Sequence, residues 1–89
     1  MKGSLIRKRY ILVFWEVSSA SADRDLYNYY GIKRKYRNDK FCIYMCNQLN
    51  RNSTMKIIRN KGGYTIITSG TIKKCKNAIS KFNMEEASH

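Results

Sequence analysis

The chain has no proline and only one histidine, His89, which is its last residue. Its 89 residues include just six aspartates and glutamates. A catalytic Ser–His–Asp or Cys–His set has no internal histidine to use. The acids lie at helix starts or in the tail and form no convincing pair for general acid–base chemistry. We therefore expect no active site in the protein itself, and a small nuclease is the least favoured function.

Long hydrophobic runs are also missing. The longest apolar run, Tyr10 to Trp15, is far shorter than the roughly 20 residues that span a bilayer. No n-h-c pattern of a signal peptide is present. We expect no membrane partner and one small domain over residues 1–89, with a core of about 7–82 and loose ends.

Cysteine is scarce, and its count of three is odd: Cys42, Cys46 and Cys75. An odd, unpaired set fits a reducing compartment. On a strand, Cys42 and Cys46 would place their Cα atoms roughly 13 Å apart, at about 3.3 Å per residue, which is too far for one zinc ion. A zinc site also needs four nitrogen or sulfur ligands. We predict buried thiols, no metal site and no cofactor bound by the protein.

Positive charge is abundant, with 18 lysines and arginines and a net charge of +12. Such an excess indicates a polyanionic partner, and RNA or DNA is the commonest one for a small basic protein. The charge gathers in four clusters, and seven tyrosines could stack on bases. The strand 40–45, "KFCIYM", lacks the glycines of the RRM motif.

Hydrophobic periodicity predicts the elements. Residues 7–17 read as a strand, and a short helix lies within 18–31. A hairpin has arms 32–37 and 40–46, a helix covers 47–60, a strand covers 64–68, and an amphipathic helix runs from Ile72 through Phe82. This order predicts an α/β (α+β) fold: a ferredoxin-like βαββαβ two-layer sandwich with an extra C-terminal helix.

Two of the predicted strands, 7–17 and 40–46, carry apolar side chains on both faces. Helices cover one face of a ferredoxin-like sheet, so the other face also needs a cover. The final helix could supply part of it, and a partner protein, a second copy or stacked bases could supply the rest. We predict a partner interface at Tyr10, Phe14 and Tyr44.

The segment "TSGTIKKCKN", residues 68–77, is typical of a helix start and also of a phosphate-binding turn. Gly70 permits a tight strand-to-helix turn, and free N–H groups at a helix start attract anions. The hydroxyls of Ser69 and Thr71 can cap the helix or bond a phosphate oxygen. The spacing of a P-loop is absent. The predicted RNA-binding residues are Arg9, Lys33, Arg34, Lys35, Ser69, Gly70, Thr71, Lys73, Lys74 and Lys76.

The segment "SGTIKK", residues 69–74, follows a β-branched strand and opens a basic C-terminal helix. In this setting it resembles the archaeal and eukaryotic ribonuclease P protein component 2 family. "RKRYILVFWEV", residues 7–17, resembles the opening strand of that family, and "IYMCN", residues 43–47, resembles its third strand. The resemblance covers about residues 7–80. Both predicted inner helices are shorter than is usual in the family.

The resemblance implies a non-catalytic subunit of ribonuclease P, which removes the 5′ leader of precursor tRNA. The RNA subunit does the chemistry with Mg²⁺. The implied partners are that RNA, precursor tRNA and the TIM-barrel-like protein component 3, with possible self-association. The implied location is cytoplasmic in an archaeon and nuclear or nucleolar in a eukaryote. Among single residues, Ser69, Gly70, Thr71, Lys73 and Lys74 carry the family signature.

Two other classes stay open. One is a basic ferredoxin-like RNA- or DNA-binding module, ribosomal or viral, that is not tied to ribonuclease P. The other is a small structural protein that uses its charge for solubility. A steep dependence of binding on salt separates both nucleic-acid binders from the structural protein.

Overall fold

The computed structural model describes residues 7–38 and 40–87, with side chains up to Phe82. The elements are β1 (Lys8–Trp15), α1 (Ala20–Tyr30), β2 (Arg34–Asn38), β3 (Phe41–Asn47), a 3-10 turn η2 (Gln48–Asn50), α2 (Arg51–Asn60), β4 (Gly63–Ser69) and α3 (Ile72–Ala87). This order confirms the predicted βαββαβ arrangement with a final helix. Within the described ranges, no helix is both long and apolar enough to cross a membrane.

The four strands form one antiparallel sheet in the order β2-β3-β1-β4. This is the strand order of a ferredoxin-like fold, so the predicted fold class is confirmed. β1 is central and pairs with both β3 and β4. Leu12 lies opposite Ile43 on one side and Ile67 on the other, and a bulge in the β1–β4 pairing follows at Leu12/Val13. β2 and β4 are the edges of the sheet.

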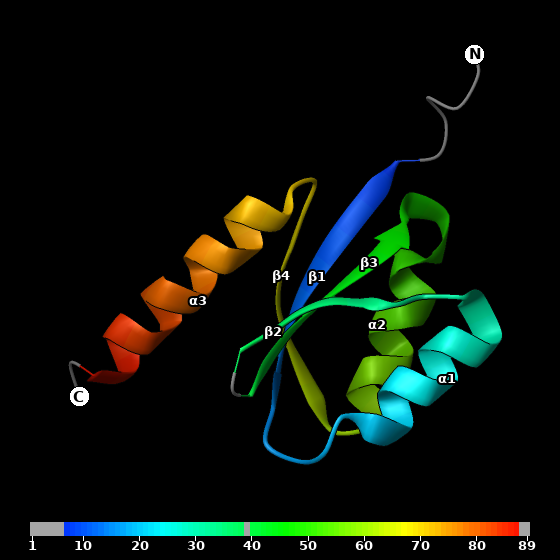
Figure 1. The fold of residues 1–89 in the computed structure, drawn as a ribbon, viewed down its shortest axis with the longest axis horizontal. Helices are drawn as coiled ribbons and strands as arrows, with labels where there is room; N and C mark the ends of the chain where they lie inside the picture. Colours follow the sequence, from blue (N-terminus) through cyan, green and yellow to red (C-terminus); the bar gives the residue numbers. More distant parts are fainter. Residues whose placement is uncertain (1–6, 39, 88–89) are drawn as a thin grey trace.

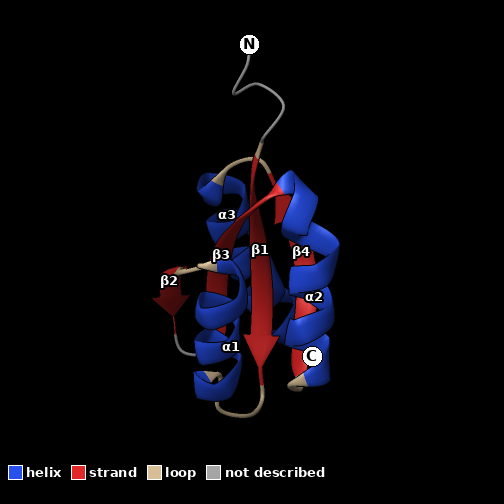
Figure 2. Cartoon of the chain, turned by 90° about the vertical axis from the view of Figure 1, so that its right-hand side faces the viewer, coloured by secondary structure: helices blue, strands red, loops and turns tan. Residues whose placement is uncertain are grey.

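Helices cover both faces of the sheet (Figure 1). α1 and α2 lie on one face, as Figure 2 shows from their side, and α3 lies on the other. Alternation along β1 sends Ile11, Val13 and Trp15 into the core under α1 and α2, where they meet Leu26 and Ile58. The two-sided apolar pattern of β1 thus produces two cores.

The second core lies under α3. Leu12 and Ile43 from the sheet pack against Cys75 and Ile79 of the helix. Beside them the rings of Phe14, Phe41 and Phe82 form a triangle with centroid separations of 5.3 to 5.6 Å. The expectation that the final helix could supply part of the cover of this face is therefore confirmed.

The ends of the chain differ from the expectation. α3 continues to Ala87, so the C-terminal segment expected to be loose from residue 83 is helical over most of its length. The N-terminal residues 1–6 that were expected to be loose lie outside the described residues. Arg7 is described and precedes β1 directly.

At two positions the structure requires a glycine. Gly31 ends α1 in the left-handed region, with φ 67°, and its N–H donates to the Tyr27 carbonyl. Gly63 begins β4, where a Cβ would lie 2.8 Å from the Trp15 ring and 2.7 Å from Ile58. Absence of a side chain at residue 63 therefore lets β4 pass close to the Trp15 ring.

All three cysteines are free and buried, as predicted. Burial raises the pKa of Cys75 from 9.0 to about 11. Burial is also the main cause that raises the pKa of Cys42 and Cys46. The thiols therefore stay protonated in the folded chain over a range in which the unfolded chain ionises them.

The aromatic triangle should dominate the attachment of α3. Phe41 is 4% exposed, and Phe41→Ala should lower the free energy of unfolding by about 3–5 kcal/mol, through lost burial and the cavity left behind. Urea denaturation followed by circular dichroism measures this. Tyr64→Ala removes an aromatic side chain that is 64% exposed and should change stability by less than about 0.5 kcal/mol. An equal loss in the free energy of unfolding for both variants would contradict the burial of Phe41 in the second core.

Stability should fall at alkaline pH. The folded pKa of Cys75 lies above its unfolded value, so its contribution is complete below about pH 9 and is lost as pH rises toward 11. Cys75→Ala removes this contribution. The free energy of unfolding of the wild type, plotted against pH, should therefore fall more steeply than that of the variant, by up to about 1.4 kcal/mol per pH unit. Urea denaturation at a series of pH values tests this, and parallel curves would refute it.

Candidate nucleic-acid interface

The first candidate site lies at the end of the sheet where β1 begins and β3 and β4 end (Figure 1). A pocket of about 430 Å³ opens there, and we call it the Gly70 pocket. Arg9 from β1, Arg51 from α2 and Lys74 from α3 each bring one cation to it, beside Ser69 and Gly70. Three segments far apart in the sequence therefore place positive charge around one depression.

Arg9 is held in place from two sides. Its Nε donates a 2.7 Å hydrogen bond to Oε1 of Gln48 in η2. On the other side, a Cβ at Gly70 would lie 3.0 Å from Arg9 Nη1. Gly70 does not have the positive φ found at Gly31 and Gly62. The glycine therefore leaves room for the guanidinium, beyond the tight turn that the sequence predicted.

Arg51 was not among the predicted RNA-binding residues. Its side chain lines the Gly70 pocket, and its Nε is buried with no hydrogen-bond partner among the described residues. A buried donor without an acceptor costs about 1–3 kcal/mol, and more when charged. Because this Nε has almost no accessible surface, an anion in the pocket would interact with the charge of the guanidinium as a whole. The arrangement therefore favours occupation by an oxyanion.

Ser69 and Thr71 cap the start of α3. Ser69 Oγ accepts from the Thr71 N–H at 3.2 Å, and Thr71 Oγ1 accepts from the Lys74 N–H at 3.4 Å. The predicted capping is confirmed. Because each hydroxyl acts as an acceptor in these bonds, its own O–H remains able to donate to a phosphate oxygen. Capping and the predicted anion contact are therefore compatible.

The other predicted RNA-binding residues divide between two places. Lys73 is exposed beside Lys74 at the start of α3. Lys76 lies over the Tyr36 ring of β2, with its Nζ 4.5 Å from the ring centroid, in a cation–π contact. The residues Lys33, Arg34 and Lys35 lie at or next to β2, the edge opposite β4. The structure thus brings together Arg9, Ser69, Gly70 and Lys74, with Thr71 and Lys73 next to them.

Arg34 belongs to a polar network beside the first core. Its Nη1 pairs with Asp23 Oδ2 at 2.6 Å, and Tyr44 donates its hydroxyl to Asp23 Oδ1. Ser19 Oγ donates to Asp23 Oδ2 at 3.3 Å. Burial, followed by the hydrogen bond to Asp23, raises the pKa of Tyr44 well above its usual value. The tyrosine therefore stays neutral and acts as a buried donor.

The predicted partner interface needs correction at Tyr44. This side chain is 1% exposed, because pairing with Ile11 places it on the sheet face under α1. Tyr10 and Phe14 are half-buried, and both pack into the second core with α3. One side chain of the proposed trio is thus internal, and the other two lie largely under a helix of the chain itself.

The chemistry of the Gly70 pocket is that of a donor site. The charged side chains lining it are Arg9, Arg51 and Lys74, with no carboxylate or imidazole beside them. Within the described residues, no group of three or more His, Cys, Asp or Glu side chains could hold a metal ion. The pocket is suited to binding phosphate rather than to moving protons.

Binding of single-stranded RNA should depend on these cations. Each phosphate contact contributes about 0.7 to the slope of log affinity against log salt for a single strand. Arg9→Gln, Arg51→Gln and Lys74→Gln should each reduce the slope by about this amount, as measured by fluorescence anisotropy with a labelled RNA. Lys81→Gln removes an exposed charge from the far part of α3 and is the matched control. If all four variants lose the same slope, charge alone and not the pocket governs binding.

Comparison with models of known families, with curated proteins and with solved structures finds no match to this chain. The likeness to component 2 of ribonuclease P therefore stays a prediction from the segments that carry it.

Proposed function

We propose that this chain is a protein subunit of ribonuclease P, which assists a catalytic RNA in removing the 5′ leader of precursor tRNA. In this role the protein binds RNA and a second protein subunit and contributes no catalytic group. The Gly70 pocket is the RNA-contacting site in this proposal. The RNA supplies the reaction chemistry, with Mg²⁺ as its metal.

One observation carries the proposal. The segment "SGTIKK" on which the resemblance rests lies at the start of α3, next to Arg9 and Arg51. A signature that served only to start a helix would not need cations from two other elements beside it. Here the glycine of the signature leaves room for the Arg9 guanidinium, and its second lysine lines the same pocket. Signature and basic pocket therefore coincide.

The alternative, a basic RNA- or DNA-binding module unrelated to ribonuclease P, uses the same pocket and the same charges. The two differ in partner and in reaction. The module would bind nucleic acid with a steep salt dependence and would have no effect on cleavage of precursor tRNA.

Reconstituted cleavage of precursor tRNA tests the proposal. An archaeal-type ribonuclease P RNA and its component 3 are assayed at low Mg²⁺, with and without this chain. We expect the chain to restore cleavage, because bound cations of the protein reduce the need for free Mg²⁺ around the RNA. The Lys73→Ala, Lys74→Ala double variant should restore less, and Lys81→Ala should restore as much as the wild type.

Two results would overturn the proposal. One is an absence of rescue together with an absence of any complex with component 3. The other is equal rescue by an unrelated basic protein of similar charge, which would show that positive charge alone accounts for the effect.

A further inference from the structure

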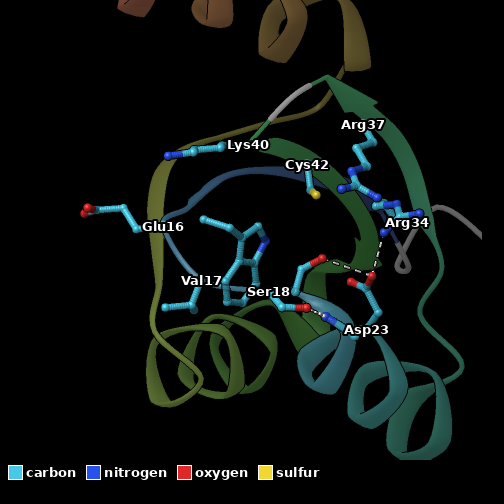
Figure 3. Close-up of a pocket in the computed structure, with 11 residues that line it drawn as sticks. Glu16, Val17, Ser18, Asp23, Arg34, Arg37, Lys40 and Cys42 are labelled. Atoms are coloured by element: carbon cyan, nitrogen blue, oxygen red, sulfur yellow. Dashed lines mark hydrogen bonds and ion pairs between the residues drawn. The ribbon is translucent and has the colours of Figure 1, made fainter.

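A second pocket lies at the opposite end of the sheet, where β1 leads into α1 and β2 turns into β3 (Figure 3). Its volume is about 380 Å³, within the range of roughly 300–1,000 Å³ typical of small-ligand sites. Trp15, the only tryptophan of the chain, forms part of its wall, so we call it the Trp15 pocket.

Two arginines stand on one wall of this pocket. In the β2–β3 pairing Arg34 lies opposite Tyr44 and Arg37 opposite Cys42, so both side chains belong to the sheet face that α1 covers. Figure 3 shows Arg34 and Arg37 close together, with Asp23 and Cys42 nearby. Arg34 uses Nη1 for Asp23 and retains its other N–H donors. Arg37 makes no ion pair among the described residues.

The acids at the pocket offset part of this charge, and the charge of Arg37 remains. Asp23 is already engaged by Arg34, Tyr44 and Ser19. Glu16 is exposed, and Figure 3 shows it extending outward, on the side where Lys40 also lies. A ligand with acceptor oxygens would therefore meet the donors of Arg37 and the remaining donors of Arg34. It would also lie near the engaged carboxylate of Asp23 and the carboxylate of Glu16 at the rim.

The wall of the pocket contains a donor without an acceptor. Trp15 is 4% exposed, and its Nε1 is buried with no hydrogen-bond partner among the described residues. An indole N–H can only donate. The Tyr44 hydroxyl lies close to this N–H without completing a hydrogen bond to it. A small shift of the pocket wall would let an acceptor oxygen of an occupant reach the N–H and recover the cost of an unpaired donor, about 1–3 kcal/mol. This observation, independent of the arginines, points to the same kind of ligand.

The start of α1 adds the Ser18 hydroxyl, which accepts one bond and can still donate, and backbone N–H groups of the first turn. Ser18, Ser19 and Ala20 line the pocket at the start of this helix, and Ser18 Oγ accepts from the Ala20 N–H at 3.3 Å. Ser19, at the N-cap position, makes no side-chain cap bond to the helix. N–H groups of the first turn have no acceptor within the helix. The helix start therefore contributes positive potential without being the basis of the site.

We propose that the Trp15 pocket binds a phosphate group of an RNA through Arg34, Arg37 and the N–H of Trp15. The identity of the macromolecule rests on the proposed function, whereas the affinity for phosphate does not. Arg9 and Trp15 stand at opposite ends of β1, six residue steps apart, or roughly 20 Å at about 3.3 Å per step. The chain would thus hold two phosphates at opposite ends of one strand.

The indole N–H of Trp15 reports on the pocket directly. A single tryptophan gives a single indole peak in a ¹H–¹⁵N correlation spectrum of the full chain. Titration with inorganic phosphate at constant ionic strength and pH should shift this peak in a saturable way, as the N–H gains an acceptor. Acetate, the carboxylate probe, should shift it less and without saturation over the same range.

Charge variants test the assignment. Arg37 is exposed and makes no packing contribution described here, so Arg37→Gln should keep the fold and weaken phosphate binding about tenfold. Glu16→Gln should strengthen it, because it removes the carboxylate at the rim. Lys81→Gln should leave it unchanged. A short RNA with a 5′-phosphate, compared with the same RNA ending in a 5′-hydroxyl, then distinguishes a terminal phosphate from a backbone phosphate.

Three outcomes would overturn the inference. The first is a peak that does not respond to phosphate. The second is equal binding by Arg37→Gln and wild type. The third is equal affinity for acetate, which would make an acidic protein segment the better occupant. Phosphate binding without rescue of precursor-tRNA cleavage would uphold the pocket and remove the proposed function, and rescue without phosphate binding would do the reverse.

Discussion

Burial of the sheet on both faces is the constraint on which the rest of this structure depends. β1 sends Ile11 and Val13 to one side and Leu12 to the other, and all three side chains are fully buried. A two-layer sandwich would expose one of these two faces of the sheet to water. α3 is therefore required as a third layer. Docking of α3 in turn fixes where "SGTIKK" lies, at the end of the sheet that also holds Arg9 and Arg51. The position of the basic pocket is therefore a consequence of core packing.

Much of this arrangement could be predicted from the sequence, because it follows from strong local signals. The strand over residues 7–17 was recognisable from its β-branched and aromatic residues, and the helix from Ile72 from the spacing of its apolar residues. Side-chain placement was predicted less well where one residue type serves two environments. Tyr44 is predicted at a partner interface and is internal, whereas Tyr29 on α1 is 73% exposed. A tyrosine pattern cannot distinguish these cases, because the ring favours burial and the hydroxyl favours either water or a buried acceptor such as Asp23. The sequence predicts a helix over 47–60, but Leu49 lies in the η2 turn that precedes α2 and is 75% exposed.

The candidate sites could also be predicted only in part from the sequence. The signature at residues 69–74 was visible as a motif, and its capping bonds follow from hydroxyls at the start of a helix. Arg51 falls in one of the four charge clusters of the sequence, with Lys56, Arg59 and Lys61, but it is not among the predicted RNA-binding residues. Its direct neighbours are asparagines and a serine, which carry no functional pattern. The strand order contains the missing information: in an antiparallel βαββαβ sheet, the start of the first strand and the ends of the third and fourth meet at one end. The Trp15 pocket could not be predicted in this way, since it depends on an unpaired indole N–H that only coordinates reveal.

The positive charges on β2 lie away from the Gly70 pocket. They have a second role, because β2 is an edge strand of the sheet. An edge strand offers unpaired backbone groups to any passing extended chain, and such growth leads to aggregation. β2 is exposed along most of its length, carries Arg34, Lys35 and Arg37, and has a register shift between Arg34 and Tyr36. Positive charge and a bulge are two of the devices by which natural sheets discourage strand addition. In a chain with a net charge of +12, the like charges of two copies repel each other at this edge, which disfavours pairing of the sheet with a second copy through β2.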